Sequence, residues 1–396
     1  MLPETKKIVP AERILNLPPY VFAELDVWKE EALANGINYI DLGMGNHDGA
    51  TPAPIVDAAV KSLYEAKNHG YPSFKGKKEF REAISQWMKK RYDVEVCPEL
   101  EVQTLLGAKE GLAHLAMAYT NPGDINIVPD PYYPVHSRGT WLANGEIYHI
   151  KLEEKNNFLP DLDSIPEDVA RRAKIFFINY PNNPTSAIAP VEYLEKLVAY
   201  CKKYGILLCS DLAYGEICFD GYRPPSIFSI PCAKDIAIEF HTFSKTFNMA
   251  GWRIGFAVGN KEYIHALYTL KTNVDYGTSS ICQEAAIAAL NVDRPHIDAI
   301  VNKYQQRRDL LVDGFKKLGW NVSTPKATMY LWLKVPTGFD SKSWCKMVLN
   351  TAGIVFTPGM AFGEHSDGYF RVSLVQPEEK LLEALSRLEK AGIRYA

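Results

Sequence analysis

Short apolar runs alternate with longer segments of helical periodicity through most of the chain. The short runs have the composition of buried strands, which we predict at 37–42, 102–106, 125–129, 174–179, 206–210, 236–240 and 254–258. Between them apolar residues recur every three or four positions, which predicts helices at 55–67, 77–91, 108–120 and 191–204. Apolar strands that alternate with helices are typical of a mostly parallel sheet covered on both faces. The pattern therefore predicts an α/β fold.

The pattern changes after about residue 290. A long charged helix is predicted at 299–318, then strands at 329–335, 354–358 and 369–375, and a last helix at 378–392. This order indicates a separate, smaller α+β domain. We therefore predict three parts, namely an N-terminal arm that contributes to the small domain (1–45), a large domain (46–290) and a small C-terminal domain (291–396).

Composition and charge exclude several classes of protein. Apolar residues make up 47% of the 396 residues and charged residues 23%, as in ordinary globular proteins. A net charge of −3 argues against a nucleic-acid-binding surface. We find no apolar run of about 18 residues, so no membrane span is expected, and no secretory signal begins the sequence. The seven cysteines lack C-x-x-C spacing, which favours free thiols in a reducing cytoplasm.

A lysine lies between two of the predicted strands, where surface residues are not expected. Lys245 belongs to the segment Ser-Lys-Thr after one apolar run, and Arg253 follows eight positions later, before the next run. Such a segment is either a polar turn or a pocket that holds a reactive lysine. If the lysine reacts, burial and the nearby Arg253 should lower its pKa.

Two glycine-containing turns offer places for a ligand. In LLGAKEGLAHL (105–115) the free amides of Gly107, Ala108 and Lys109 would begin a helix, which suits a phosphate, although many such turns bind nothing. GMGNHDG (43–49) is one residue too long for a dinucleotide-binding fingerprint. We interpret it as a turn that lets a small ligand approach the backbone.

Three polar residues stand in apolar surroundings. Asn183 follows a predicted strand between two prolines, and Asp211 ends another strand. Each has an ordinary interpretation, as a turn residue or as a helix cap. Arg371 interrupts a C-terminal strand and requires an anion, which is either an internal carboxylate or that of a ligand.

Taken together, these residues favour one cofactor. All except Arg371 are expected at the carboxyl ends of parallel strands, where open α/β sheets bind ligands. Pyridoxal phosphate (PLP) requires an amine for its aldehyde, an acid for its ring nitrogen and a site for its phosphate. Lys245, Asp211 and the turn at Gly107 meet these three requirements.

The segments SKTFNMAGWRIG, PNNPT, SDLAY and FRVS, in this order, resemble the class I/II aminotransferases of PLP fold type I over essentially the whole chain. The resemblance implies a three-layer fold with a mostly parallel seven-stranded sheet and a smaller α+β domain. It also implies a cytoplasmic homodimer with shared active sites, which transfers an amino group between an amino acid and a 2-oxo acid.

The resemblance assigns three groups of residues. The catalytic residues would be Lys245, Asp211 and Tyr214, with Lys245 bound to the cofactor and then carrying the proton. The cofactor would be held by Gly107, Ala108, Lys109, Tyr133, Asn183, Asp211, Tyr214, Thr242, Ser244, Lys245 and Arg253, and by Tyr71 of the partner subunit. The substrate would be bound by Gly45, Asn183 and Arg371. No metal site is implied.

Substrate choice is the open part of this interpretation. GMGNHDG, DLAYGEICFDGYRPPS and VDYGT resemble bacterial alanine (glutamate–pyruvate) transaminases, so alanine and glutamate are the expected donors. LL-Diaminopimelate aminotransferases, which share the GAK turn, and aspartate or broad-specificity aminotransferases are the alternatives. No second free arginine is evident for a distal carboxylate, which leaves Tyr20, His47 or a partner residue. A distal ammonium would require an acidic group, and Glu110 lies too near the phosphate helix.

Two other functions remain on the same fold. A PLP-dependent β-lyase or decarboxylase would use the same lysine and acid. A module that binds an effector without catalysis is the more distant alternative. Three departures from the family pattern are Thr242 in place of serine, Ser186 in place of glycine, and His47 in place of proline.

Overall fold

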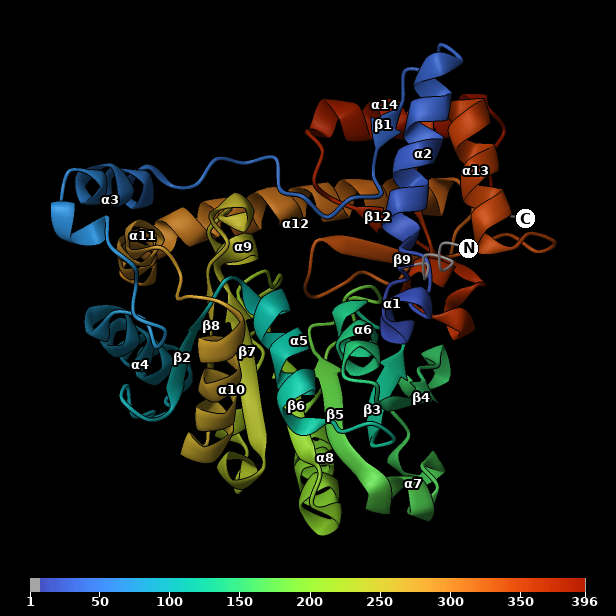
Figure 1. Cartoon of the computed structure of the whole chain (residues 1–396). Coiled ribbons are helices and arrows are strands. Elements are labelled where there is room, and N and C mark those ends of the chain that lie inside the picture. Colours follow the sequence, from blue (N-terminus) through green and yellow to red (C-terminus); the bar gives the residue numbers. More distant parts are fainter. Residues whose placement is uncertain (1–7, 396) are drawn as a thin grey trace, which may run out of the picture.

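A seven-stranded sheet forms the centre of the computed structural model, which describes residues 8–395 (Figure 1). The strand order is β2-β8-β7-β6-β5-β3-β4. The strands are β2 (Val102–Leu105), β3 (Ile125–Asp130), β4 (Glu146–Lys151), β5 (Ala173–Asn179), β6 (Leu207–Asp211), β7 (Ala237–Thr242) and β8 (Gly255–Gly259). The pairs from β4 to β7 are parallel, while β8 is antiparallel to both β7 and β2. The sheet is thus mostly parallel, as predicted.

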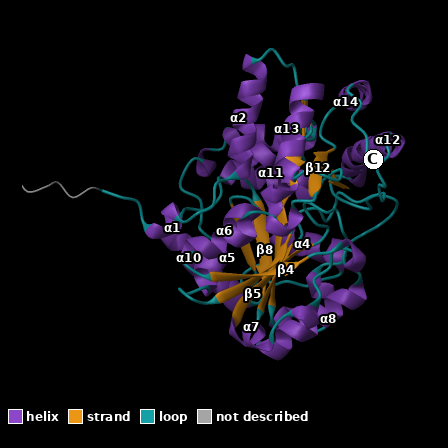
Figure 2. Cartoon of the chain, turned by 90° about the vertical axis from the view of Figure 1, so that its right-hand side faces the viewer, coloured by secondary structure: helices purple, strands orange, loops and turns teal. Residues whose placement is uncertain are grey.

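Helices cover both faces of this sheet, which explains why its central strands are apolar throughout. Alternate residues of β5 face opposite sides. Phe177 packs in the cluster with α5 (Ala108–Tyr119) and α10 (Lys261–Val274), and Phe176 packs in the cluster with α8 (Val191–Tyr204). The other helices of this part are α3 (Ala53–Leu63), α4 (Lys78–Tyr92), α6 (Val135–Leu142), α7 (Glu167–Arg172), α9 (Phe243–Thr246) and α11 (Ser280–Leu290). Figure 2 shows the sheet edge-on between its helices.

The prediction of a long strand at 37–42 is wrong. Only β1 (Ile40–Asp41) is extended there, and it pairs in parallel with β10 (Ile354–Val355), outside the central sheet. The seventh strand of the sheet is β4, whose sequence EIYHIK is only partly buried. A strand at the sheet edge has one covered side, so it lacks the continuous apolar run on which the prediction depended.

A smaller α+β domain lies beside one end of the sheet (Figure 1). Its antiparallel sheet has the order β11-β12-β9, with β9 (Tyr330–Lys334), β11 (Thr357–Pro358) and β12 (Tyr369–Ser373). Its helices are α12 (Arg294–Lys317), α13 (Ser341–Ala352) and α14 (Glu378–Lys390). Within residues 8–395, no helix has the length and apolar character needed to cross a bilayer.

The N-terminal segment joins both parts of the molecule. Short helix α1 (Glu12–Leu15) lies beside α6 of the large part, whereas α2 (Val21–Ala34) packs against α13 of the small domain. The first seven residues of the predicted arm lie outside the described residues. The domain boundaries at 45/46 and 290/291 stay a prediction.

Candidate active site

A cavity of about 540 Å³ lies where β5, β6 and β7 end, and the small domain closes its other side. It brings together most of the residues that the sequence predicted for the site. Those that line it are Gly45, Ala108, Lys109, Tyr133, Asn183, Asp211, Tyr214, Thr242, Ser244, Lys245, Arg253 and Arg371. Arg253 precedes the antiparallel strand β8 and so lies at its amino end, which corrects the prediction of a carboxyl end.

Lys245 projects into this cavity from α9, the single helical turn after β7. Its Nζ donates a hydrogen bond to the carbonyl oxygen of Gly45 over 2.7 Å. Burial lowers the pKa of Lys245; Tyr330 opposes this shift, and the charges of Arg371 and Arg253 add to it. The neutral amine is therefore favoured relative to a lysine in water, as the sequence predicted.

Asp211 ends β6 with one carboxylate oxygen unpaired. The side chain is buried, and its Oδ2 lies 3.3 Å from Nε2 of His136. Among the described residues Oδ1 has no hydrogen-bond partner. An unpaired buried acceptor is costly, and a protonated ring nitrogen would satisfy it. The acid therefore fits the pyridine ring of PLP.

Arg371 reaches the cavity from β12 and carries an uncompensated charge. Its Nη1 donates to Oδ1 of Asn183 over 2.8 Å, and its Nη2 donates to the carbonyl oxygen of Gly43 over 2.7 Å. The residue is 2% exposed, and its Nε has no partner in the described part of the chain. No carboxylate of residues 8–395 forms an ion pair with it. The internal salt bridge that the sequence left open is thus absent here, and a ligand carboxylate suits the site.

The predicted phosphate turn connects β2 to α5. Gly107 adopts a φ of +86°, and a Cβ at this position would lie 2.8 Å from Nη2 of Arg253. Glycine thus allows the left-handed turn and the close approach of the guanidinium. Gly107 belongs to the backbone of the turn, but it does not line the cavity.

The hydroxyl of Thr242 has a local role on the facing turn. It accepts from the amide of Ser244 over 3.2 Å and donates to the Ser244 hydroxyl over 2.9 Å. Thr242 therefore caps α9 and aligns the side chain of Ser244. Both residues line the cavity close to Lys245.

Tyr71 is not brought to the cavity of its own chain. The side chain is 84% exposed and stacks on Tyr276, with 4.6 Å between the ring centres. That Tyr71 serves another subunit stays a prediction.

His47 does not offer a polar group to the cavity, contrary to the expectation from the sequence. Its Nδ1 lies 3.0 Å from the carbonyl oxygen of Gly49, and its Nε2 accepts from the amide of Ala250. These contacts require a neutral ring with its proton on Nδ1. Burial also lowers the pKa of His47. The histidine therefore fastens the segment 45–49 to the loop after Lys245.

Sequence reasoning missed Tyr330, which lies at the centre of the site on β9. Its hydroxyl lies 3.0 Å from that of Tyr214, and its ring lies under the guanidinium of Arg371. Burial would raise the pKa of Tyr330, but Arg371 and Lys245 hold it below its usual value. In the sequence this tyrosine is one aromatic residue in the run MYLWLKV, so its hydroxyl gave no separate signal.

His136 and Asn179 were also missed. His136 contacts Asp211 from α6, a helix that the sequence analysis did not predict. The Asn179 side chain donates to the carbonyl oxygen of Asp211 and accepts from the amide of Asn183. Asn179 thus fixes two strand ends against each other, and only the pairing of β5 with β6 reveals this.

Comparison with known proteins supports the chemistry of the cavity. The chain is 51% identical over 379 residues to the LL-diaminopimelate aminotransferase of Aquifex aeolicus, which covers 96% of this chain and 98% of that protein. It is 48% identical over 387 residues to LL-diaminopimelate aminotransferase 2 of Trichormus variabilis, covering 98% and 99%. A substrate-bound structure of BacF from Bacillus subtilis aligns over 99% of both chains, with a TM-score of 0.94 and 37% identity.

The family model described as aminotransferase class I and II matches residues 37–388. This match covers nearly the whole chain, including the lysine, acid and arginine of the cavity. The fold is likewise that of the fold-type I aminotransferases. The chain belongs to the class I and II aminotransferases, enzymes that use PLP to transfer an amino group between an amino acid and a 2-oxo acid.

Proposed function

We propose that LL-diaminopimelate is the amino donor of this aminotransferase, with 2-oxoglutarate as acceptor. The observation that carries the proposal is the similarity to proteins named for that activity. These are 51% and 48% identical to this chain over 96% and 98% of its length. The similarity favours the alternative left open by the sequence over the expected pair of alanine and glutamate. The proposal concerns the donor alone, because the amino-transfer chemistry follows from the family.

The charges at the rim of the cavity support a donor with two amino-acid heads. Asp26, on α2, and Lys109, on α5, both line the cavity, and both are exposed. The Asp26 carboxylate also lies 2.6 Å from Nζ of Lys29. One amino-acid head of LL-diaminopimelate would bind at Arg371. The ammonium of the other head would meet the carboxylate of Asp26, and its carboxylate would meet the ammonium of Lys109. Alanine has no second head, so neither rim charge would contribute to its binding.

Three residues would carry the proton chemistry and hold the donor. When PLP is bound, its ring withdraws the electrons of the bond to the α-proton. The amine of Lys245 would take this proton and return it, a role for which its lowered pKa suits it. The Asp211 carboxylate would keep the ring nitrogen protonated, and Arg371 would bind the α-carboxylate.

Other residues would orient the cofactor. Tyr214 and Asn183 would contact the ring hydroxyl, and Tyr133 would lie against the ring. The phosphate would be held by Gly107, Ala108, Lys109, Thr242, Ser244 and Arg253. Lys109 would then serve both phosphate and rim, with its amide facing the first and its side chain the second.

The active enzyme would be a homodimer in which Tyr71 reaches the partner's phosphate. Exposed aromatic residues support this assembly, since Tyr276, which stacks on Tyr71, is 52% exposed, and Tyr64, seven positions before Tyr71 in the chain, is 86% exposed. Aromatic side chains are enriched in protein interfaces relative to the rest of the surface. A reducing cytoplasm is the proposed location, because all seven cysteines are free.

The test compares kcat/KM for LL-diaminopimelate and for alanine, each with 2-oxoglutarate as acceptor. We expect a preference of more than about tenfold for LL-diaminopimelate, which corresponds to about 1.4 kcal/mol in the transition state. A preference for alanine would restore the first expectation. Release of ammonia or carbon dioxide without an acceptor would instead indicate lyase or decarboxylase chemistry.

A further inference from the structure

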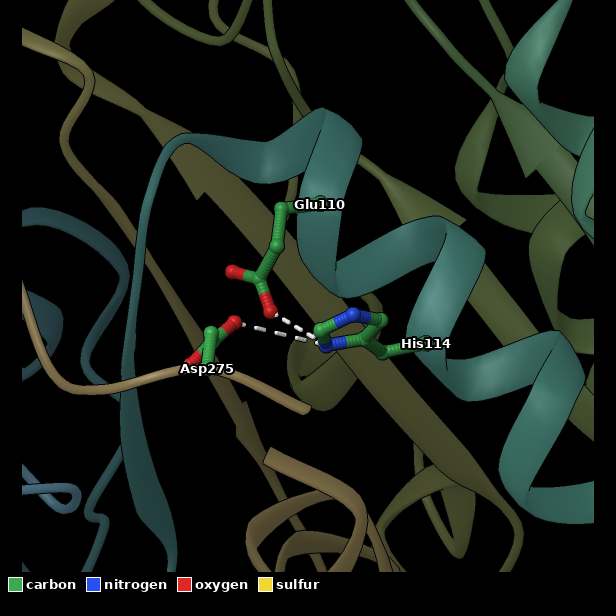
Figure 3. A group of neighbouring side chains, drawn as sticks. All are labelled: Glu110, His114 and Asp275. Atoms are coloured by element: carbon green, nitrogen blue, oxygen red, sulfur yellow. Dashed lines mark ion pairs between the residues drawn. The ribbon is translucent and has the colours of Figure 1, made fainter. Parts of the chain in front are cut away.

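A fully buried ammonium lies behind the turn that begins α5. Lys271, on α10, has no exposed surface. Its Nζ lies 3.1 Å from Oε1 of Glu110, and 2.9 and 3.1 Å from the two carboxylate oxygens of Asp275. Figure 3 shows Glu110 and His114 pointing from α5 toward Asp275, on the segment that follows α10.

The cluster has the spacing of a metal site but not its charge. Ligand atoms of Glu110, His114 and Asp275 lie within 4.8 Å of one another. Lys271 already contacts both carboxylates, so a divalent cation there would be repelled by the ammonium. The cluster is therefore an internal network of ion pairs, in which the ammonium of Lys271 supplies the positive charge that a metal ion would otherwise supply.

Glu110 connects this network to the turn. It is the third residue of α5, and its Oε2 accepts from the amide of Leu106 over 3.0 Å. This bond fixes the backbone directly before Gly107, in the manner of an N-terminal helix cap. The N-terminus of a helix has a positive electrostatic potential that favours a bound anion. The Glu110 carboxylate neutralises part of this potential, so less of it remains to attract a phosphate.

These two effects of Glu110 oppose each other for a bound phosphate. The hydrogen bond orders the turn, whereas the negative charge repels a dianion at the neighbouring amides. Burial would raise the pKa of Glu110, but His114 and Lys271 lower it, so the carboxylate is charged at neutral pH. A compensating positive charge is therefore needed if the turn is to receive a phosphate.

We propose that Lys271 is a positioning residue for the cofactor phosphate: its ammonium offsets one of the two negative charges of Glu110 and Asp275 behind the turn, while Glu110 holds the turn in place. The inference rests on the proposed position of the phosphate at Gly107, Ala108 and Lys109. Lys271 acts from behind the turn, since it lines neither the cavity at Lys245 nor the neighbouring one at Arg138.

The test measures the dissociation constants of PLP and of pyridoxal, which lacks the phosphate, for full-length variants. In Lys271→Met two carboxylates remain without the ammonium, so we expect the PLP constant to rise about tenfold or more. The pyridoxal constant should change less than about twofold, because the effect acts through the phosphate. The double variant Lys271→Met/Glu110→Gln restores the charge count and should recover most of the PLP affinity.

The phosphorus resonance of the loaded enzyme gives a second readout. An uncompensated Glu110 should raise the pKa of the cofactor phosphate in Lys271→Met, so its ³¹P shift should titrate at higher pH than in the wild type. Equal losses of PLP and pyridoxal affinity, without rescue in the double variant, would mean that Lys271 only stabilises the fold.

If Lys271→Met does not fold, Glu110→Gln alone decides. This variant keeps an acceptor for Leu106 and removes one negative charge, so it should bind PLP about threefold more tightly or better, and pyridoxal as before. Weaker PLP binding would overturn the inference. Arg253→Gln tests the phosphate position separately, because it should weaken PLP and spare pyridoxal. If Arg253→Gln fails this test, the assigned phosphate site is wrong.

Discussion

The guanidinium carbon of Arg371 lies 4.2 Å from the centre of the Tyr330 ring. The two residues come from neighbouring strands of the small domain, and Tyr330 also approaches the backbone of Gly45. The aromatic face supports the cation in a buried place where no carboxylate of the described chain pairs with it. The shape of the candidate substrate site therefore depends on Tyr330 as well as on the arginine.

The first prediction concerns Gly45. A Cβ at this position would lie 2.1 Å from the Tyr330 hydroxyl, so Gly45→Ala must displace the ring and the guanidinium above it. We expect KM for every amino donor to rise about tenfold or more, with a smaller change in kcat. Gly368→Ala is the control, since a Cβ there meets no atom within 4 Å. Unchanged KM values would show that Tyr330 does not set the position of Arg371.

Replacement of Arg371 tests the common part of all substrates. Arg371→Lys removes the fork that can bind a carboxylate through two hydrogen bonds and loses the contact with Asn183. We expect kcat/KM to fall by about 10² or more for LL-diaminopimelate, glutamate and alanine alike. The exposed Arg394→Lys serves as control. A loss confined to dicarboxylic donors would mean that Arg371 binds the side chain instead.

Asp26 tests the part that distinguishes the donors. If its carboxylate binds the distal ammonium, Asp26→Asn should raise KM for LL-diaminopimelate about threefold to fivefold. KM for alanine should stay within about twofold, because alanine has no distal ammonium. Asp57→Asn, on α3, is a matched control, since it too is exposed. Equal effects on both donors would assign Asp26 a purely structural role through Lys29.

His47 makes stability depend on pH. Its folded-state pKa lies below that of an exposed histidine, about 6.5, so the unfolded chain binds the proton first as pH falls. The contribution of the neutral ring is complete above about pH 6.5 and is lost as pH falls through the folded-state pKa. The stability difference between wild type and His47→Gln, measured by urea unfolding, should therefore be larger at pH 7.5 than at pH 5.5.

Subunit mixing tests the role of Tyr71. Lys245→Ala and Tyr71→Ala chains should each form inactive or weakly active homodimers. A mixed dimer would contain one site with both wild-type residues, so activity should return to about a quarter of the wild-type value in an equal, exchanged mixture. Mixtures of Lys245→Ala with Tyr64→Ala are the control. Both chains keep Tyr71, so every site that contains Lys245 should be active whether or not Tyr71 is shared between subunits. No recovery after proven exchange would contradict a shared site.

Much of the site could be predicted because its residues stand where polar groups interrupt apolar strands. Lys245, Asp211 and Asn183 lie at the ends of neighbouring strands, so the strand pattern alone brings them to one edge of the sheet. The sequence also identified Arg371 by its cost in an apolar strand. These predictions required no knowledge of helix packing.

The missing residues depend on packing that no local pattern records. Tyr330 comes from a small-domain strand that reaches the site across the cavity, and His136 comes from a short helix with a weak pattern. His47 was misinterpreted because a loop histidine could point either to the ligand or to the backbone. Strand β4 was missed because a sheet edge hides only part of each side chain.

The reversed direction of β8 explains why one short segment identifies the family so clearly. Parallel neighbours require a crossover of about a dozen residues or more, which separates their functional residues along the chain. Because β8 runs against β7, the chain turns back at once, and Lys245 and Arg253 reach the same edge within eight positions. The short loop between Lys245 and Arg253 thus fixes the distance between the amine and the guanidinium. An insertion or deletion of even one residue in this loop would change the separation of these two groups. The loop should therefore tolerate changes in length far less than the crossovers between the parallel strands do.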